Sequence, residues 1–408
     1  MIGKAAIIGG SMSGLFAALI LRRRGWSVDI YEASRKELAG RGAGIITHAG
    51  LGEALAAAGV TSDDLGVPVR GRRVYNHDGS IHGAIDFPQT NTSWDRLFDL
   101  LKSALPAGSY RLGKRLDAIR SDPAGVDLTF DDGTTARADL VVGADGFRSA
   151  VRHAFLPGID PTYAGYVAWR GLVEEAELSP EARRELFDSF TFCLPPGEQM
   201  LGYPVAGRDN DLRPGHRRFN FVWYRPAAEG AGLDRMLTDE TGRRHDISIP
   251  PPLIDRQVIA EMRVAADTVL APLFREAVSL ARAPFFQPIY DLAVPRMTAE
   301  RIALIGDAAF VARPHVGAGV TKAAEDALAL AGALAAHDDI GAALAAFEAD
   351  RLPIGHRIID QARRLGSYMQ AQIKTAEEQA AAERHRSPEA VMVETASVAF
   401  LEAAAESA

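Results

Sequence analysis

Apolar runs alternate with amphipathic stretches at the start of the chain. Residues 4–9 are almost wholly apolar, residues 12–25 carry apolar side chains at helical spacing, and residues 27–32 form a second short run. A buried strand, a helix and another strand in this order predict a βαβ unit. Two later apolar runs, 139–143 and 301–305, predict further buried strands.

The pattern changes between about residues 160 and 290, where short β-rich segments contain many aromatic residues. This region predicts an antiparallel sheet inserted between α/β parts of the chain. Two long helices are then expected to run to about residue 369, and the Ala- and Glu-rich remainder has a helix start at Ser387–Pro388. The predicted fold is therefore α/β, with a mainly antiparallel β-sheet insert and a C-terminal helical segment.

Composition narrows the classes of partner. The 408 residues carry a formal net charge of −8 and scattered arginines, which argues against nucleic acid or an anionic membrane as the main partner. Cys193 is the only cysteine, so an intramolecular disulfide is excluded and no metal site is predicted. The first predicted strand begins almost at Met1, so we expect no signal peptide, and no apolar stretch approaches the roughly 18 residues of a membrane span. A cytoplasmic protein is expected.

The stretch GGSMSG, residues 9–14, follows the first predicted strand and opens the first helix. It fits the dinucleotide-binding fingerprint with Gly9, Ser11 and Gly14 at the three glycine positions, Ser replacing the middle glycine. Free N–H groups and the positive helix end can face a pyrophosphate, and Glu32 can bind ribose hydroxyls. A glycine turn without a ligand is the alternative, but strand, turn, helix, strand and Glu together favour a nucleotide site.

A second motif, LVVGADGFRSAVR at 140–152, delivers Asp145-Gly146 to the carboxyl end of a buried strand. Ligands of open α/β sheets bind at such strand ends. Taken alone, the motif is better explained as an ordinary Asp-Gly turn followed by a solvated pair of arginines, Arg148 and Arg152.

The third motif is LIGDAAFVARPHVGAG at 304–319. Asp307 leaves a buried strand beside a helix expected to start near Val316, so its carboxylate can accept hydrogen bonds from a polyol. The N–H groups of residues 317–320 can hold a carbonyl-rich ring. Among dinucleotides, FAD has a polyol chain, the ribityl. A buried Asp as a helix cap is the alternative, but it leaves Pro314, Gly317 and Gly319 unexplained.

These three motifs, in this order, resemble those of the single-component FAD-dependent aromatic hydroxylases, the flavoprotein monooxygenases of the para-hydroxybenzoate hydroxylase type. The resemblance covers roughly residues 3–365. It implies that the first motif binds the ADP half of FAD and that the Asp-Gly motif lies near the pyrophosphate, where it is implicated in NAD(P)H use. Asp307 is then implied to bind the ribityl, and the proline loop to line the isoalloxazine.

Within this family, the stretches PTYAGYVAWRG (161–171), LGYPVAGRDN (201–210) and GDAAFVARPHVGAG resemble the 2,6-dihydroxypyridine 3-hydroxylase branch. The chain departs from common family patterns at three places. Phe310 stands where members often have His, Ala318-Gly319-Val320-Thr321 where the usual pattern is Gln-Gly-Xaa-Asn, and Ser93-Trp94-Asp95 where many have an Arg.

The resemblance also implies the cofactor contacts and the reaction. FAD is expected to be non-covalent, and NAD(P)H to act as a transient co-substrate. The implied reaction is hydroxylation of a small hydroxylated aromatic ring, a hydroxypyridine or phenol, by O2 through a flavin C4a-hydroperoxide. A homodimer is expected. The expected FAD contacts are Gly9, Ser11, Met12, Ser13, Gly14, Glu32, Ala33, Arg41, Leu116, Asp145, Asp307, Pro314, Gly317, Ala318, Gly319 and Val320.

Four residues are candidates for catalysis. Deprotonating a substrate hydroxyl makes the ring a better nucleophile, so a base with a near-neutral pKa is useful, and His315 or His48 could serve. Each could equally be a structural or solvated histidine. Tyr203 is a candidate hydrogen-bond partner at the ring, and Arg170 could hold an anionic substrate or shield the flavin.

The implied domain division is discontinuous. An FAD-binding domain with a Rossmann-like fold is expected to comprise 1–70, 98–160 and 290–365. A substrate domain is expected to comprise 71–97 and 161–289. Residues 366–408 are expected to form the C-terminal helical segment.

Other functions account for fewer of these sequence features. An NAD-dependent dehydrogenase leaves residues 304–321 without a role, and a flavin halogenase lacks its expected Trp-rich element here. A non-catalytic flavin-binding or interaction protein, and a flavoprotein oxidoreductase that does not hydroxylate, remain as alternatives.

Overall fold

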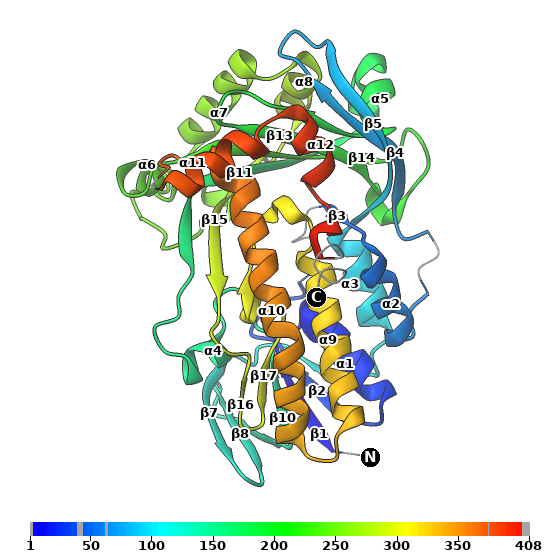
Figure 1. The fold of residues 1–408 in the computed structure, drawn as a ribbon, viewed down its shortest axis with the longest axis vertical. Helices are drawn as coiled ribbons and strands as arrows, with labels where there is room; N and C mark the ends of the chain where they lie inside the picture. Colours follow the sequence, from blue (N-terminus) through cyan, green and yellow to red (C-terminus); the bar gives the residue numbers. More distant parts are fainter. Residues whose placement is uncertain (1–2, 39–43, 62–63, 374, 402–408) are drawn as a thin grey trace.

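The computed structural model describes residues 3–38, 44–61, 64–373 and 375–401. Within these residues the strands form three sheets, and helices lie at the upper end of the molecule and along its length (Figure 1). The predicted class is confirmed: α/β, with an antiparallel sheet and C-terminal helices added to a parallel sheet.

The first sheet contains the predicted βαβ unit. Its order is β16-β17-β10-β1-β2-β6, and all neighbouring pairs are parallel except β16 with β17. Strand β1 is central and buried, because its side chains are apolar on both faces. The strands are β1 (Lys4–Ile8), β2 (Ser27–Tyr31), β6 (Tyr110–Arg111), β10 (Leu140–Gly143), β16 (Thr298–Ala299) and β17 (Ile302–Leu304).

The second sheet has the order β18-β15-β11-β14-β13-β12-β4-β5-β3. Its pairs are antiparallel except β12 with β4. Its strands are β3 (Gly44–Ile46), β4 (Val67–Tyr75), β5 (Ile81–Ser93), β11 (Thr162–Glu174), β12 (Ser189–Cys193), β13 (Gln199–Val205), β14 (Arg218–Pro226), β15 (Phe285–Ala293) and β18 (Phe310–Val311). The third sheet is a hairpin of β8 (Gly125–Phe130) and β9 (Thr135–Ala138) with β7 (Leu116–Asp122).

Strand alternation decides which aromatic residues face a ligand and which fill the core. Phe219, Phe221 and Trp223 of β14 point to the side covered by α7 and α8, in a separate apolar cluster. Val222 and Tyr224, which alternate with them along the strand, point to the opposite side. The helices on the covered side are α5 (Pro180–Leu186), α6 (Ala231–Met236), α7 (Arg256–Val269) and α8 (Pro272–Leu280).

The helices around the first sheet connect the two halves of the molecule. Helix α10 runs along the molecule beside α9 and reaches from the first sheet to the second (Figure 1). These helices are α1 (Met12–Arg23), α2 (Ala49–Ala58), α3 (Trp94–Ser103), α4 (Ala150–Phe155), α9 (Gly319–Ala336) and α10 (Ile340–Gly366).

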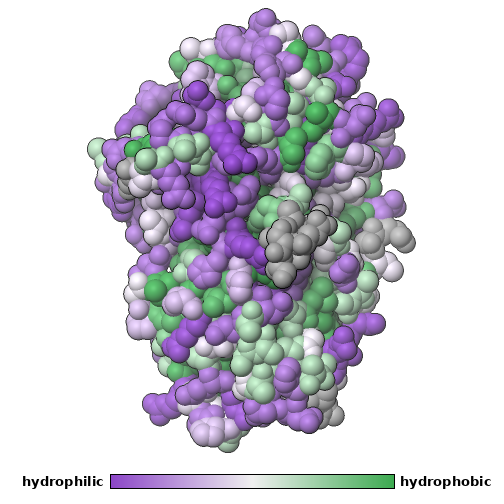
Figure 2. Space-filling model, viewed as in Figure 1, coloured by the Kyte–Doolittle hydropathy of each residue, from purple (hydrophilic) through white to green (hydrophobic). Residues whose placement is uncertain are grey.

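The C-terminal segment folds back over the second sheet as α11 (Ala376–His385) and α12 (Pro388–Glu394), which begins after Ser387 as predicted. Helix α12 packs against β4 and β5. On the face shown in Figure 2, hydrophilic residues gather over α11 and the upper part of α10. No described helix is long and apolar enough to cross a membrane.

Candidate active site

The first motif is a tight turn in which side chains have no room. Gly9 has φ +105°, and a Cβ on it would lie 2.3 Å from the carbonyl oxygen of Ala144. A Cβ on Gly14 would lie 1.9 Å from the carbonyl oxygen of Gly9. Both positions therefore require glycine, and Ser11 precedes helix α1 without capping it by its side chain. The N-terminal N–H groups of α1 are thus not capped by Ser11, as a phosphate site needs.

Glu32 stands at the end of β2 beside this turn. Its carboxylate accepts hydrogen bonds from the backbone N–H groups of Gly10, at 2.9 Å, and Ser34, at 2.7 Å. These bonds fix the carboxylate next to the glycine turn. Ala33 follows at half-buried depth, and Leu116 begins β7, close by, where Phe130 of β8 stacks on Tyr31 at 4.6 Å.

The second motif lies at a strand end, where ligands often bind, but its side chains bond to the protein itself. The carboxylate of Asp145 accepts bonds from its own loop, at 2.5 Å from the Ser149 hydroxyl and 2.7 Å from the Ala150 N–H. Arg152 is buried rather than solvated, and it donates to the carbonyl oxygens of Ala308 at 3.0 Å and Phe147 at 2.9 Å. The second motif therefore anchors the turn that carries Asp307.

The first and third motifs meet at Gly306. This glycine has φ +61°, and a Cβ on it would lie 2.1 Å from the Ser13 hydroxyl oxygen. Asp307 follows in a 3-10 turn, Gly306–Ala308. Its carboxylate faces a cavity and has no hydrogen-bond partner among the described residues. The Asp307 side chain is exposed at this cavity, and desolvation by the protein packed around it raises the pKa of its carboxyl, while the nearby Lys322 lowers it. An acceptor without a partner at this place fits a polyol.

The loop after Asp307 differs from the predicted helix start. Pro314–Val316 is a short 3-10 turn, Gly317 is left-handed with φ +64°, and α9 begins at Gly319 rather than near Val316. Ala318, the residue before α9, cannot cap the helix with its side chain. The first N–H groups of α9 therefore remain available to a ligand at the helix N-terminus.

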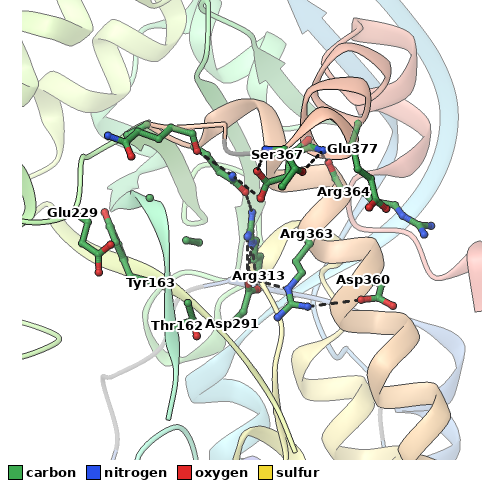
Figure 3. Close-up of a pocket in the computed structure, with 18 of the residues that line it drawn as sticks. Thr162, Tyr163, Glu229, Asp291, Arg313, Asp360, Arg363, Arg364, Ser367 and Glu377 are labelled. Atoms are coloured by element: carbon green, nitrogen blue, oxygen red, sulfur yellow. Dashed lines mark hydrogen bonds and ion pairs between the residues drawn. The ribbon is translucent and has the colours of Figure 1, made fainter. Parts of the chain in front are cut away.

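Arg313 holds this loop in place from behind. Its guanidinium donates to the Asp291 carboxylate at 2.9–3.1 Å and to the Gln370 side-chain oxygen at 2.7 Å. Both members of the Arg313–Asp291 pair are buried, and Arg363 also reaches Asp291 at 3.3 Å (Figure 3). A second cavity of about 540 Å³ opens beside Arg313, with charged residues of both signs along it.

The cavity that Asp307 faces has a volume of about 250 Å³ and lies between the two sheets. From the second sheet it receives Arg170 of β11, Tyr203 of β13 and Tyr224 of β14. Burial raises the pKa of Tyr203, and raises the pKa of Tyr224 to about 12, so both hydroxyls are protonated donors near neutral pH. Its lining includes Gly44, Ile46, Phe190, Leu201, Val222, Asp307, Pro314, His315, Gly317, Ala318, Gly319, Val320, Lys322, Thr395 and Ala396.

Arg170 has no carboxylate partner among the described residues, and its Nε is buried without a hydrogen bond. Arg170, Tyr203 and Tyr224 line the same cavity, and the positive charge of Arg170 lowers the pKa of both tyrosine hydroxyls. A cation and two hydroxyl donors at one wall of the cavity can bind an oxyanion.

The two candidate histidines lie in different places. His315 is fully buried at the cavity, its Nε2 is 2.7 Å from the Tyr166 hydroxyl, and its Nδ1 has no partner in the described chain. Burial lowers the pKa of His315 to about 3, far below that of a base poised near neutrality. His48 lies outside the cavity lining, with Nε2 3.3 Å from the Gly317 carbonyl oxygen, so it supports the loop from behind.

Several site residues were not predicted from the sequence. Lys322, on α9, is buried with its Nζ 3.5 Å from Asp326 and without a hydrogen bond. Thr395 and Ala396 come to the cavity from the far end of the chain. Phe310, where family members often have His, packs on α10, because a Cβ on Gly355 would lie 2.3 Å from its ring. Arg41 lies outside the described residues, and Met12 is buried in the first turn of α1.

The glycine turn is followed by Gly306, Asp307 and then the cavity, and this arrangement fits a long dinucleotide that ends in a ring. No group of metal-ligating side chains occurs in the described ranges. A family model described as an FAD binding domain matches residues 3–197 and 257–362, and one described as FAD binding domain-like matches residues 163–291.

Individual relatives agree with the family model. The chain is 36% identical over 368 residues to a 2,6-dihydroxypyridine 3-monooxygenase of Paenarthrobacter nicotinovorans, covering 90% of this chain and 91% of that one. It is 30% identical to a 3-amino-4-hydroxybenzoate 2-monooxygenase of Streptomyces cremeus, covering 89% and 86%. The crystal structure of 2,6-dihydroxypyridine-3-hydroxylase from Arthrobacter nicotinovorans superposes with a TM-score of 0.86 at 34% identity, covering 92% and 94%.

The chain belongs to the FAD-binding family of flavoprotein monooxygenases of the para-hydroxybenzoate hydroxylase type, the FAD-dependent aromatic hydroxylases. It is therefore an FAD-dependent monooxygenase, with reduced nicotinamide as the co-substrate.

Proposed function

We propose that this enzyme hydroxylates a small hydroxypyridine or phenol that binds as its oxyanion. The observation that carries the proposal is the uncompensated guanidinium of Arg170, next to the hydroxyls of Tyr203 and Tyr224 in the cavity. A cation in a cavity otherwise rich in apolar and aromatic side chains favours a flat anion. The similarity to relatives named for dihydroxypyridine and aminohydroxybenzoate supports this substrate class.

We place FAD along the three motifs, and the residues present fit it. Gly9 and Gly14 leave room only for backbone at the pyrophosphate, Glu32 is fixed beside them, and Asp307 offers a carboxylate without a protein partner to the ribityl. The loop 314–320 and the start of α9 receive the ring. When bound and reduced by NAD(P)H, FAD would activate O2, of which one oxygen atom goes to the substrate and the other to water.

The cavity residues then bind the substrate and do not act as a general base. Arg170, Tyr203 and Tyr224 stabilise the oxyanion and so lower the pKa of the substrate hydroxyl, which makes the ring a better nucleophile. His315, neutral at working pH, lines the cavity and holds Tyr166 by a hydrogen bond. The tyrosines donate protons to the oxyanion rather than removing them.

The test is a comparison of free and methylated ring hydroxyls. Hydroxypyridines and phenols should stimulate NAD(P)H oxidation and gain one oxygen atom beside the ring hydroxyl, whereas their O-methyl ethers should not. Arg170→Met should raise the substrate KM about tenfold or more, because a charge-assisted contact is lost, and Arg170→Lys should recover part of it. The exposed Arg208→Met is the matched control.

Two outcomes would contradict the proposal. NAD(P)H consumption that yields only hydrogen peroxide with every ring would indicate an oxidoreductase that does not hydroxylate. Equal stimulation by a ring and its O-methyl ether would show that the substrate does not bind as an oxyanion and that Arg170 does not have the proposed role.

We also propose the domain division 1–70, 98–160 and 290–365 for FAD, and 71–97 and 161–289 for substrate, followed by the helical segment 366–408. A cytoplasmic location is supported by the single, buried Cys193. A homodimer is supported by the exposed Ile81 and Val393, which lie on the mutually packed β5 and α12. Light scattering of the purified protein and of Val393→Asp tests the dimer, because only the variant should be monomeric.

A further inference from the structure

Residues 395–396 reach the active-site cavity from a segment that the catalytic motifs do not include. Thr395 and Ala396 follow α12 and line the same cavity as Arg170 and Asp307. The N–H of Ala396 donates to the carbonyl oxygen of His315 at 2.6 Å, so this segment is bound directly to the loop expected to hold the flavin ring. A Cβ on Gly317 would lie 3.1 Å from the Cα of Ala396, which shows how closely the two backbones approach.

The segment is held from the other side by a buried cation. Arg72 of β4 is fully buried, and its guanidinium donates to the carbonyl oxygens of Met392 at 2.7 Å, Thr395 at 2.6 Å and Ala396 at 3.2 Å. These are carbonyl groups at the C-terminal end of α12 and just after it, where a positive charge is favoured. The Gln89 side chain also donates to Ala396, at 3.2 Å.

The burial of Arg72 is not explained by an ion pair. Arg72 makes no ion pair with a carboxylate within the described residues, and the Phe87 ring lies 3.7 Å from its guanidinium carbon. Burial lowers the pKa of Arg72 to about 9, so the side chain stays charged near neutral pH. A buried charge that bonds only to neutral oxygens is costly unless every bond is kept, so these contacts fix the segment in one place.

The backbone of the segment is also constrained. Ala396 has φ +55°, a left-handed conformation that residues other than glycine seldom adopt. Such a conformation persists only where surrounding contacts impose it, and here they come from Arg72, Gln89 and His315. The result is a rigid wall rather than a loose chain end.

We propose that Thr395 and Ala396, fixed by Arg72, are a specificity-determining wall of the substrate cavity. The inference rests on the proposed function, since it assumes that an aromatic ring binds there. Thr395 is buried and stands beside Gln199 of β13, on the same strand face as Leu201 and Tyr203. The size of residue 395 then limits the substituents that the ring can carry, while Arg170 of β11, Tyr203 of β13 and Tyr224 of β14 contact the oxyanion.

The test changes the size of residue 395 in the full-length, FAD-loaded enzyme. A parent hydroxypyridine and its ring-methylated analogue are titrated by the change in flavin absorbance, which reports binding without turnover. Thr395→Leu should weaken binding of the methylated ring about tenfold or more relative to the parent, and Thr395→Ala should relax that preference, because one methyl group in a packed pocket discriminates by about this factor. FAD affinity should change less than about twofold in both variants.

The matched control is Val398, three residues further along the same segment. Val398 lines a different cavity, the one beside His48. Val398→Leu and Val398→Ala should leave the ranking of the two rings unchanged. An unchanged ranking in both Thr395 variants, or an equal change in the Val398 variants, would overturn the inference.

A second measurement tests the anchor. Arg72→Met should speed hydrogen exchange in residues 387–401 about tenfold or more, whereas Arg73→Met, on the neighbouring position of β4 and paired with Glu185 at 3.0 Å, should not. Equal exchange in both variants would contradict the role of Arg72. Rings that bind but are never hydroxylated would overturn only the proposed function, and a wild type that binds no ring would overturn both.

Discussion

His315 and Tyr166 share a buried hydrogen bond of 2.7 Å that joins the loop 314–320 to strand β11. The imidazole also packs against Tyr224, with ring centroids 4.4 Å apart. Because neither ring reaches bulk water, the protein must keep the imidazole neutral, and burial does so by lowering the pKa of His315 to about 3 from 6.5. Protonation of this imidazole in acid should therefore destabilise the loop that faces the cavity.

This pKa shift predicts a specific pH dependence of stability. Between the folded value near 3 and the unfolded value of 6.5 the unfolded chain binds the extra proton, so stability rises with pH in this window. The contribution of His315 is complete above pH 6.5 and is lost as the pH falls below it, by at most about 1.4 kcal/mol per pH unit. Urea unfolding should show a shallower loss on acidification for His315→Gln than for the wild type. The exposed His337→Gln should behave like the wild type, and equal slopes for all three proteins would contradict the assignment.

Asp307→Ala is expected to weaken FAD binding. The carboxylate is the one group at the turn that can accept charge-assisted hydrogen bonds from the ribityl, and losing them costs about 1.5–3 kcal/mol, or roughly ten- to 150-fold in Kd. Fluorescence titration of the apoprotein with FAD measures this. Asp350→Ala, an exposed carboxylate on α10, serves as the control. FAD affinity unchanged in Asp307→Ala would remove the residue from its proposed role.

Lys322→Met should make FAD binding depend on pH. The ammonium of Lys322 lowers the pKa of Asp307, which desolvation by the surrounding protein raises, so removal of the ammonium leaves Asp307 protonated at a higher pH. A protonated carboxyl is a weaker acceptor, and FAD affinity should therefore fall at a higher pH in the variant than in the wild type as the solution is acidified. Lys322→Arg should keep the wild-type profile. Two superimposable profiles for Met and wild type would show that Lys322 does not act through Asp307.

The flavin is expected to be non-covalent. Cys193, the sole cysteine, is buried in β12 and does not line the cavity, and His315 is engaged with Tyr166. Acid precipitation should leave all of the FAD in the supernatant. A pellet that keeps its yellow colour after washing would contradict this prediction.

Much of the fold could be predicted because its signals are local. The apolar runs at 4–9 and 27–32 became β1 and β2, and the Ser387–Pro388 signal became the start of α12. The start predicted for α9, near Val316, is too early, because the helix begins at Gly319. Gly317 adopts a left-handed conformation that ends a separate 3-10 turn, and periodicity alone does not distinguish such a turn from the first turn of a helix.

The walls of the cavity were harder to predict because they depend on partners distant in sequence. Tyr224 faces the cavity only because β14 pairs with β11 and β13 in one register, so that Tyr224 lies opposite Ala168 and Gln199. Arg72 looks like any exposed arginine in the stretch VRGRRVY until α12 is placed over it. The arginine pair after Asp145 was expected to be solvated, but Arg152 is buried by its contact with the distant Ala308.

The strand order of the second sheet has a consequence for how the chain folds. In this sheet β12 pairs in parallel with β4, and β11 pairs with β15. The paired strands are far apart in the sequence, so a long loop must close before they make any contact. Loop closure of this kind slows folding, so the second sheet should form after the local βαβ unit. The cavity between the sheets is then completed late, and FAD can bind only to the finished structure. Added FAD should therefore slow unfolding of this protein while leaving its refolding rate almost unchanged.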